Sequence, residues 1–206
     1  MKTVTQGIGP FFKKFDYLES IDSTNEYLKS YVAEGEPRIV VAGEQTAGKG
    51  RYSRRWYSPL GKGLYVSYLL YPGWHIGRIP FLEMLAGLAV VGAVVKTAPT
   101  TFSVKLKRPN DVYISGKKVC GVLTETSTSQ NQILWAIIGI GVNLYQKEFP
   151  GDLDRTATSL RAQGLSVNDP LDFCEILTQE LQHLYGELTE GRWKHLQDKF
   201  ENLLLS

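Results

Sequence analysis

A basic, glycine-rich segment at residues 44–56 holds the side chains best suited to chemistry in this sequence. Its glycines alternate with Lys49 and Arg51, and it ends at Trp56. Glycines let backbone N–H groups approach a phosphate or carboxylate closely, and arginine offers forked donors to the same groups. The Walker pattern of phosphate-binding loops is absent, and a solvated cationic loop would have the same composition. Taken alone, the segment fits both an anion-binding loop and a surface loop.

A second polar segment, residues 105–113, leaves a predicted strand through a turn. Lys107 there precedes Pro109, Asn110 and Asp111. These three residue types dominate turns, because proline restricts φ and the other two bond to the backbone. A structural turn therefore explains the segment as well as a binding site does.

Two predicted strands contain a lysine or glycines that the packing of a half-buried strand does not require. In residues 117–125, alternation puts Lys118 and Cys120 on one face, and a lysine there is usually a surface residue whose stem covers apolar groups. In residues 138–144, glycines interrupt an apolar run ahead of Asn143. Glycine inside a strand marks a place where a ligand or another backbone can approach closely.

The strands that must position these segments are visible as β-branched and aromatic runs bounded by Gly, Pro or Asn. The predicted strands are residues 38–42, 64–71, 102–107, 112–115, 119–126 and 133–142. Gly116 and Lys117 form the predicted turn of a hairpin between two of them.

Three helices are predicted beside these strands. Ser23 and Glu26 form a capping box that begins a helix ending near Val32. Apolar spacing of three and four predicts core-facing helices at residues 81–96 and 170–188. Strands clustered in the middle, with helices before, between and after, favour an α+β fold in which helices cover one face of a mixed sheet.

Length and composition favour one soluble, cytoplasmic domain. The 206 residues show no repeat or long linker, so we predict a single domain over residues 1–206. A formal net charge of +2 gives no bulk signal for nucleic-acid binding, and no signal peptide is visible. The most apolar run, residues 84–95, is too short to span a bilayer. Cys120 and Cys174 are predicted to be buried thiols in a reducing cytoplasm.

Together these segments resemble the catalytic domain of the biotin protein ligase family, over about residues 17–200. That family carries a Gly-Arg-Gly-Arg loop ending in Trp, a Lys-Trp-Pro-Asn-Asp turn, a Lys-x-x-Gly-x-Leu-x-Glu strand and a Gly-x-Gly-x-Asn strand, and similar motifs occur here in this order. The resemblance implies a class II aminoacyl-tRNA synthetase-like fold. Helix-turn-helix and C-terminal β-barrel segments, which many members add, are not expected here, so no repressor role is implied.

The resemblance also implies a two-step, ATP-dependent and Mg²⁺-dependent ligation. The biotin carboxylate attacks the α-phosphate of ATP to form biotinyl-5′-AMP, and a lysine of a biotin carboxyl carrier domain then attacks the acyl carbonyl. Nucleic acids and membranes are not among the implied partners.

Individual roles follow from the same resemblance. The implied biotin contacts are Ser23, Thr24, Asn25, Gln45, Gly48, Lys49, Gly50, Arg51 and Lys118. The implied ATP and adenylate contacts are Trp56, Asn110, Asn143, Arg51 and Lys118. The implied catalytic residues are Arg51, Lys118, Lys107 and Asp111, with Asp111 as the metal ligand.

Three positions depart from the family pattern: Lys49 stands for Arg, Ser53 for Gly and Arg108 for Trp. Two other functions stay open, a lipoate or octanoate ligase or transferase of related fold, and a biotin-binding protein with weakened catalysis. The oligomeric state is open as well, and the apolar strand at residues 133–142 is one candidate edge for a homodimer.

Overall fold

The structure, a computed structural model, describes residues 2–3, 11–97, 103–109 and 111–205. Its strands are β1 (Lys2–Thr3), β2 (Lys14–Ile21), β3 (Arg38–Gln45), β4 (Gly63–Leu70), β5 (Val104–Lys107), β6 (Asp111–Ile114), β7 (Lys117–Ser129) and β8 (Gln132–Asn143). Its helices are α1 (Thr24–Lys29), α2 (Ile79–Thr97), α3 (Leu153–Thr156), α4 (Pro170–Thr189) and α5 (Trp193–Asn202). Its 3₁₀ turns are Val32–Glu34, Arg51–Ser53, Ile76–Arg78 and Arg161–Gln163.

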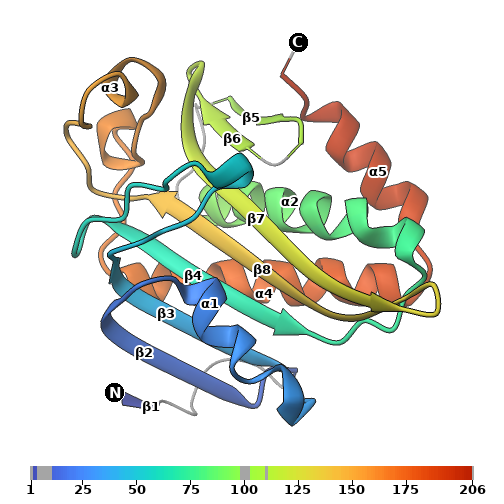
Figure 1. Cartoon of the computed structure of the whole chain (residues 1–206). Helices are drawn as coiled ribbons and strands as arrows, with labels where there is room; N and C mark the ends of the chain where they lie inside the picture. The colour runs from blue at the N-terminus through green and yellow to red at the C-terminus, as the bar shows by residue number, and fades with distance from the viewer. Residues whose placement is uncertain (1, 4–10, 98–102, 110, 206) are drawn as a thin grey trace.

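The strands form one mixed sheet in the order β1-β2-β3-β4-β8-β7-β6-β5 (Figure 1). β2 and β3 pair in parallel, whereas the other described neighbours pair antiparallel. The predicted mixed α+β sheet is therefore confirmed. The sequence patterns do not predict β2, because acidic residues interrupt its apolar alternation. One of them, Asp16, is buried and lies 2.7 Å from Arg38 on β3, which neutralises it.

Three helices cover one face of the sheet. α2 packs on β7 and β8, α4 packs on β4 and α2, and α5 packs against both helices. Figure 1 shows α2 and α4 running behind the sheet, with α1 in front. The expectation of core-facing helices at residues 81–96 and 170–188 is confirmed. α5 was outside that expectation, since it buries only Leu196 and Phe200 within its short length.

Helix α2 is the most apolar element of the fold. Together with the preceding 3₁₀ turn it spans Ile76–Thr97, which is long and apolar enough by composition to cross a membrane. We expected this apolar segment, residues 84–95, to be too short to cross a membrane. That expectation is wrong about the length, because the helical segment continues on both sides of it. In this structure the helix is enclosed by the sheet, α4 and α5, and residues such as Leu85 and Val90 are fully buried. Its apolar surface is thus used by the protein core.

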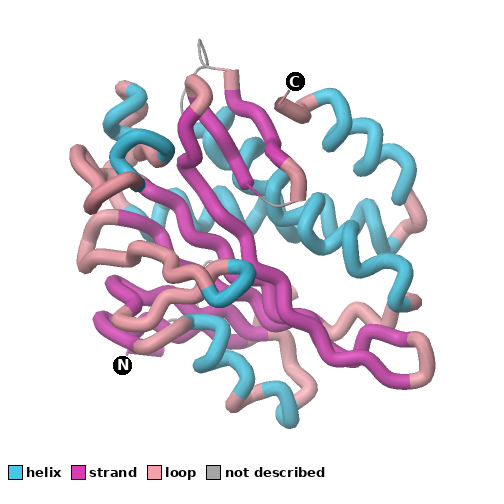
Figure 2. Tube along the Cα trace, turned by 45° about the horizontal axis from the view of Figure 1, so that its top comes forward, coloured by secondary structure: helices cyan, strands magenta, loops and turns pink. Residues whose placement is uncertain are grey.

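α1 lies on the opposite face, over a small apolar cluster of Leu28, Val40, Leu69 and Ile137. Figure 2 shows loops and short helical turns gathered on this face. The helix is shorter than the predicted span to Val32, and the predicted capping box does not form. Ser23 is the N-cap but makes no side-chain cap bond, and Glu26 accepts from Lys29 and Lys49, while the Ser23 backbone N–H donates to Asp22 Oδ1.

β8 lies inside the sheet, between β4 and β7. β4 pairs with residues 136–143 of β8 on one side, and β7 pairs with residues 132–142 on the other. The idea that the strand at residues 133–142 forms a dimer edge is wrong for this reason. The predicted hairpin is present, with its turn one residue earlier, at Ser115 and Gly116, both of which have positive φ.

Candidate active site

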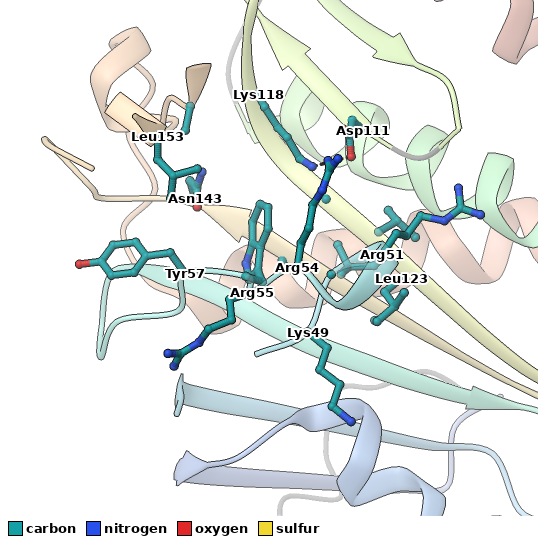
Figure 3. A pocket seen from close by; sticks show the side chains of 18 of the residues that line it. Lys49, Arg51, Arg54, Arg55, Tyr57, Asp111, Lys118, Leu123, Asn143 and Leu153 are labelled. Atoms are coloured by element: carbon teal, nitrogen blue, oxygen red, sulfur yellow. Dashed lines mark ion pairs between the residues drawn. The ribbon is translucent and has the colours of Figure 1, made fainter. Parts of the chain in front are cut away.

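A pocket of about 500 Å³ opens on the sheet face beside α1 (Figure 3). Its walls come from the start of α1, the glycine-rich segment, the β5–β6 turn, β7, β8 and α3. The residues of the predicted site that line it are Ser23, Thr24, Asn25, Gln45, Lys49, Gly50, Arg51, Trp56, Lys107, Asp111, Lys118 and Asn143. Gly48 is not among the lining residues, and Asn110 lies outside the described residues. The tertiary structure thus gathers segments that are separate in sequence.

The lining is strongly cationic. Among its described side chains, seven are Lys or Arg and one, Asp111, is acidic. The seven cations are Lys49, Arg51, Arg54, Arg55, Lys107, Arg108 and Lys118. Like charges gathered around a cavity raise the local concentration of anions. Since the glycine-rich segment forms one wall of this cavity, an anion-binding loop explains it better than a solvated surface loop does.

A polar wall stands at the α1 end of the pocket. Gln45 Oε1 accepts hydrogen bonds from Thr24 N at 2.9 Å and from Thr24 Oγ1 at 3.0 Å. Gln45 Nε2 donates to Ser58 Oγ at 3.0 Å, and Ser67 Oγ, whose proton goes to Asn25 Oδ1, lies 2.7 Å from Thr24 Oγ1. Ser23 and Thr24 are nearly fully buried. These bonds fix the side-chain rotamers, so the wall offers preorganised polar atoms to a neutral polar group.

Asn25 is held almost entirely by the protein. Its Oδ1 accepts from Ser67 Oγ at 2.6 Å, and its Nδ2 donates to Glu125 Oε2 at 2.8 Å. A Cβ on Gly139 would collide with the Asn25 amide, which gives this strand glycine a structural reason. Asn25 therefore orients the α1 start relative to β4, β7 and β8.

The indole of Trp56 lies on the backbone of β7 and β8. Gly121 and Gly141 pair in register there, and a Cβ on either residue would run into the indole. The group that approaches the strand glycines in this structure is therefore a side chain of the protein. Trp56 Nε1 is buried without a hydrogen-bond partner in the described part of the chain. The Nε1 atom lies against Gly141 of β8, so the indole packs on the sheet with its N–H unpaired among the described residues.

The glycine-rich segment forms a small closed loop. Trp56 N donates to Gly48 O at 2.9 Å, and Gly50 N donates to Arg54 O at 2.7 Å. Its tip has Tyr52 and Ser53 at φ of 56° and 59°, the left-handed region that favours glycine. Ser53 stands where the family pattern has Gly, so this departure places a side chain in strained backbone.

Ion pairs hold this loop on two sides. Lys49 Nζ lies 2.6 Å from Glu26 Oε1 on α1, and Arg51 Nη2 lies 3.4 Å from Glu83 Oε1 on α2. Burial raises the pKa of the Glu83 carboxyl, against the opposing attraction of Arg51. Hydrogen bonds from Lys29 and Lys49 lower the pKa of Glu26. Lys49 thus contacts α1 in this structure, whereas Arg51 spans toward α2.

Lys118 reaches the pocket because of a β-bulge. Tyr113 on β6 pairs with Lys118, but its neighbour Val112 pairs with Cys120, which leaves Val119 as an extra residue on β7. Val119 and Cys120 are both fully buried in the main core, whereas Lys118 lines the pocket. The expectation that Lys118 and Cys120 share a face is therefore wrong, because the bulge breaks the simple alternation.

The β6 and β7 strands bring a cation and the pocket's acid together. Lys118 Nζ lies 2.7 Å from Asp111 Oδ1 and 5.3 Å from the centre of a Trp56 ring. In Figure 3 the Arg54 side chain extends toward these two residues. Lys107 Nζ lies 5.4 Å from the Tyr113 ring. The anionic end of a ligand would meet its densest positive charge at this point.

Asn143, at the end of β8, is 3% exposed. Its Nδ2 donates to Thr158 O at 3.0 Å, and its Oδ1 accepts from Gln146 at 3.1 Å. One N–H and one lone pair of the amide stay unused by these bonds. A predicted adenine contact from Asn143 is compatible with this arrangement and stays a prediction.

Comparison with known proteins supplies the family. The sequence pattern of the biotin/lipoate A/B protein ligase family matches residues 17–143, which is more than half of the chain. The chain belongs to this family. The bifunctional ligase/repressor BirA of Bacillus subtilis is 39% identical over 158 residues, which are 76% of this chain and 48% of BirA. The chain thus spans about half the length of that relative.

Other members of the biotin/lipoate ligase family are covered more completely. The biotin–[acetyl-CoA-carboxylase] ligase of Paracoccus denitrificans is 33% identical over 83% of this chain and 72% of that protein. The structure of Aquifex aeolicus biotin protein ligase in complex with biotin and ATP matches with a TM-score of 0.79 and 35% identity, over 94% of this chain and 79% of that one. The resemblance and the expected class II synthetase-like fold are therefore confirmed.

Sequence reasoning missed several residues of this family member's site. Arg54, Ser58 and Ser67 contribute to the pocket or its polar wall, and Glu26 and Glu83 anchor the glycine-rich loop. Arg54 had a signal, since it lies inside the basic segment. Ser67 and Glu83 lie in a strand and a helix whose patterns describe only packing, so no local signal marks them.

Proposed function

We propose that the protein is an ATP-dependent biotin protein ligase that forms biotinyl-5′-AMP and transfers biotin to a lysine of a biotin carboxyl carrier domain. The observation that carries the proposal is one pocket in which a preorganised polar wall faces a cluster of cations. A neutral ureido ring with fixed donors and acceptors suits the wall around Thr24 and Gln45. A carboxylate and phosphates suit the cluster around Arg51 and Lys118.

In the first half-reaction, a carboxylate oxygen of biotin attacks the α-phosphorus of ATP. The new O–P bond forms while the bond to pyrophosphate breaks, and pyrophosphate leaves with the electron pair. Negative charge develops on the oxygen atoms around the α-phosphorus and on the leaving pyrophosphate. Arg51 and Lys118, which line the pocket, would stabilise that charge by electrostatic contacts fixed in advance.

In the second half-reaction, the neutral amine of the acceptor lysine attacks the acyl carbon of the adenylate. The C–O bond to AMP breaks, AMP leaves with the electron pair, and the amine releases a proton to solvent. Arg51 and Lys118 would also stabilise the charge that develops in this second step. Trp56 lines the pocket and would offer an aromatic face to the adenylate.

Mg²⁺ fits this pocket as a metal held mainly by phosphates. In the described part of the chain no group of three His, Cys, Asp or Glu residues could hold a metal ion, so a closed protein cage is not available. Asp111 is the acidic side chain of the described lining, and Mg²⁺ commonly takes one or two carboxylates together with substrate phosphates and water. When bound, the metal would neutralise phosphate charge, and Asp111 would hold it.

Pyrophosphate release on adding biotin and ATP tests the first half-reaction. We expect release with biotin and not with lipoate or octanoate, followed by biotin on a carrier domain lysine, detected by mass spectrometry. Release with lipoate alone would establish the lipoate alternative, and biotin binding without release would establish a binding protein.

The proposal also includes a cytoplasmic location and a function without nucleic acid. Cys120 and Cys174 are both free and buried, which suits a reducing cytoplasm. Burial raises the pKa of the Cys174 thiol to about 12, so it is unreactive. The small net charge supports a function without nucleic acid.

A further inference from the structure

The turn between β5 and β6 is the part of the pocket that lies at the end of the sheet. β5 is the last strand of the described sheet and contains only four residues. Lys107 and Asp111 face each other across the turn, as the last and first residues of the two strands, and both line the pocket. Whatever holds this turn sets the position of both side chains.

The backbone of β5 is held by the residues that follow α5. Leu106 N donates to Leu203 O at 2.8 Å, and Leu205 N donates to Leu106 O at 2.7 Å. Leu106 and Leu204 form a parallel bridge at this point. The free edge of β5 is therefore occupied by this segment, one residue before Lys107.

The Arg108 side chain ties the turn to α5. The Arg108 guanidinium pairs with the Glu201 carboxylate and lies over the Phe200 ring, 5.4 Å from its centre. Phe200 is buried, and its helix packs on α2 and α4. Arg108 thus links the pocket turn to a ring that is fixed in the core.

We infer that Arg108 is a positioning residue, through which Glu201 and Phe200 of α5 hold Lys107 and Asp111 in place for the nucleotide phosphates. This inference rests on the proposed function for the identity of the ligand. Both members of the ion pair are about half exposed, so its effect is modest, about two- to fivefold in affinity. A tryptophan at position 108 could reach the Phe200 ring by aromatic packing and would not need Glu201.

The test compares Arg108→Ala, Glu201→Ala, the double variant of these two, Arg108→Trp, and Arg108→Trp combined with Glu201→Ala. We expect KM for ATP in pyrophosphate release to rise about two- to fivefold in both single variants, with KM for biotin unchanged. The double variant should be no worse than Arg108→Ala, because one link is lost in each case. Arg108→Trp should restore KM for ATP and should not respond to Glu201→Ala.

Asp198→Ala is the matched control. Asp198 lies on the same helix and forms an exposed ion pair with Lys194, 3.2 Å away, which does not touch the turn. This variant should leave KM for ATP unchanged. Additive effects of the two single variants, or an equal rise in KM for biotin, would overturn the inference.

Amide hydrogen exchange keeps this test separate from the proposed function. In the ligand-free chain, Arg108→Ala and Glu201→Ala should accelerate exchange in residues 104–114, whereas Asp198→Ala should not. Unchanged exchange in that hairpin would refute the positioning role even if the protein ligates biotin. Accelerated exchange in a chain that releases no pyrophosphate would refute the proposed function and keep the role of Arg108 in holding the turn.

Discussion

At the scale of single residues, Arg51 and Lys118 are both paired with carboxylates of the protein. Arg51 lies beside Glu83 and Lys118 beside Asp111. Each cation therefore has a protein partner that compensates its charge. An anionic ligand must compete with Glu83 and Asp111 for the two cations. The affinity of the cations for a ligand therefore depends on both ion pairs.

Arg51→Ala and Lys118→Ala should each lose reaction rate with little loss of stability. Removing a charge-assisted contact to the carboxylate or α-phosphate costs about 2–4 kcal/mol of transition-state stabilisation. Pyrophosphate release should then slow by roughly thirty- to a thousand-fold. Lys194→Ala, at a lysine that is 88% exposed, is the control. Rates of the two site variants within about twofold of the parent would contradict the proposed roles.

Glu83→Gln should change how stability depends on pH. Burial raises the pKa of Glu83 above its ordinary value of 4.5, so its stabilising contribution is complete below that value and is lost as pH rises through the raised pKa. Glutamine does not ionise, and the variant should therefore melt at a higher temperature than the parent near neutral pH, with the difference vanishing under acid conditions. Melting temperatures measured from pH 4 to 8 test this, and Glu190→Gln on the surface is the control. A difference independent of pH would refute the assignment.

At the scale of elements, the paired strand glycines Gly121 and Gly141 leave the space in which the Trp56 indole packs on the sheet. Gly141→Ala should push the indole off β8, because the added Cβ meets Trp56 Nε1. Overpacking of this kind costs about 1–3 kcal/mol of unfolding free energy. Urea denaturation should show this loss, whereas Gly186→Ala in α4, where the Cβ meets open space, should show none. Equal stability of both variants would mean that Trp56 moves away without cost.

The glycine-rich loop is an element whose order depends on its anchors. Glu26→Ala removes the α1 partner of Lys49, and trypsin should then cut after the basic residues of the loop about two- to fivefold faster. Biotin with ATP should slow cleavage in the parent, since an anion removes repulsion among the loop cations. Asp198→Ala, remote from the loop, should leave cleavage unchanged. Ligand-independent cleavage would argue against loop closure over the pocket.

At the scale of the whole molecule, the two faces of the sheet have different tasks. One face is covered by α2, α4 and α5, which supply the main core. The other face carries α1 over a small apolar cluster and leaves the ends of β7 and β8 open to the pocket. A rigid sheet thus supports the site from behind, while loops and turns supply most of its charged groups.

The sequence by itself determined the family, the mixed sheet, the central helices and the segments that form the pocket. These follow from local properties, namely strand and helix periodicity and ordered motifs around Gly48, Asp111, Lys118 and Asn143. Such patterns depend only on neighbours along the chain, so they are visible without coordinates.

Only the tertiary structure decided how those segments meet. The bulge at Val119 turns Lys118 into the pocket, and β2 is stable because Arg38 neutralises Asp16 from another strand. Glu83 meets Arg51, and Glu201 meets Arg108 across 93 residues of sequence. These contacts depend on strand register and on the packing of distant elements, and the free energies that fix them come from long-range burial and charge pairing, which leave no local pattern in the sequence.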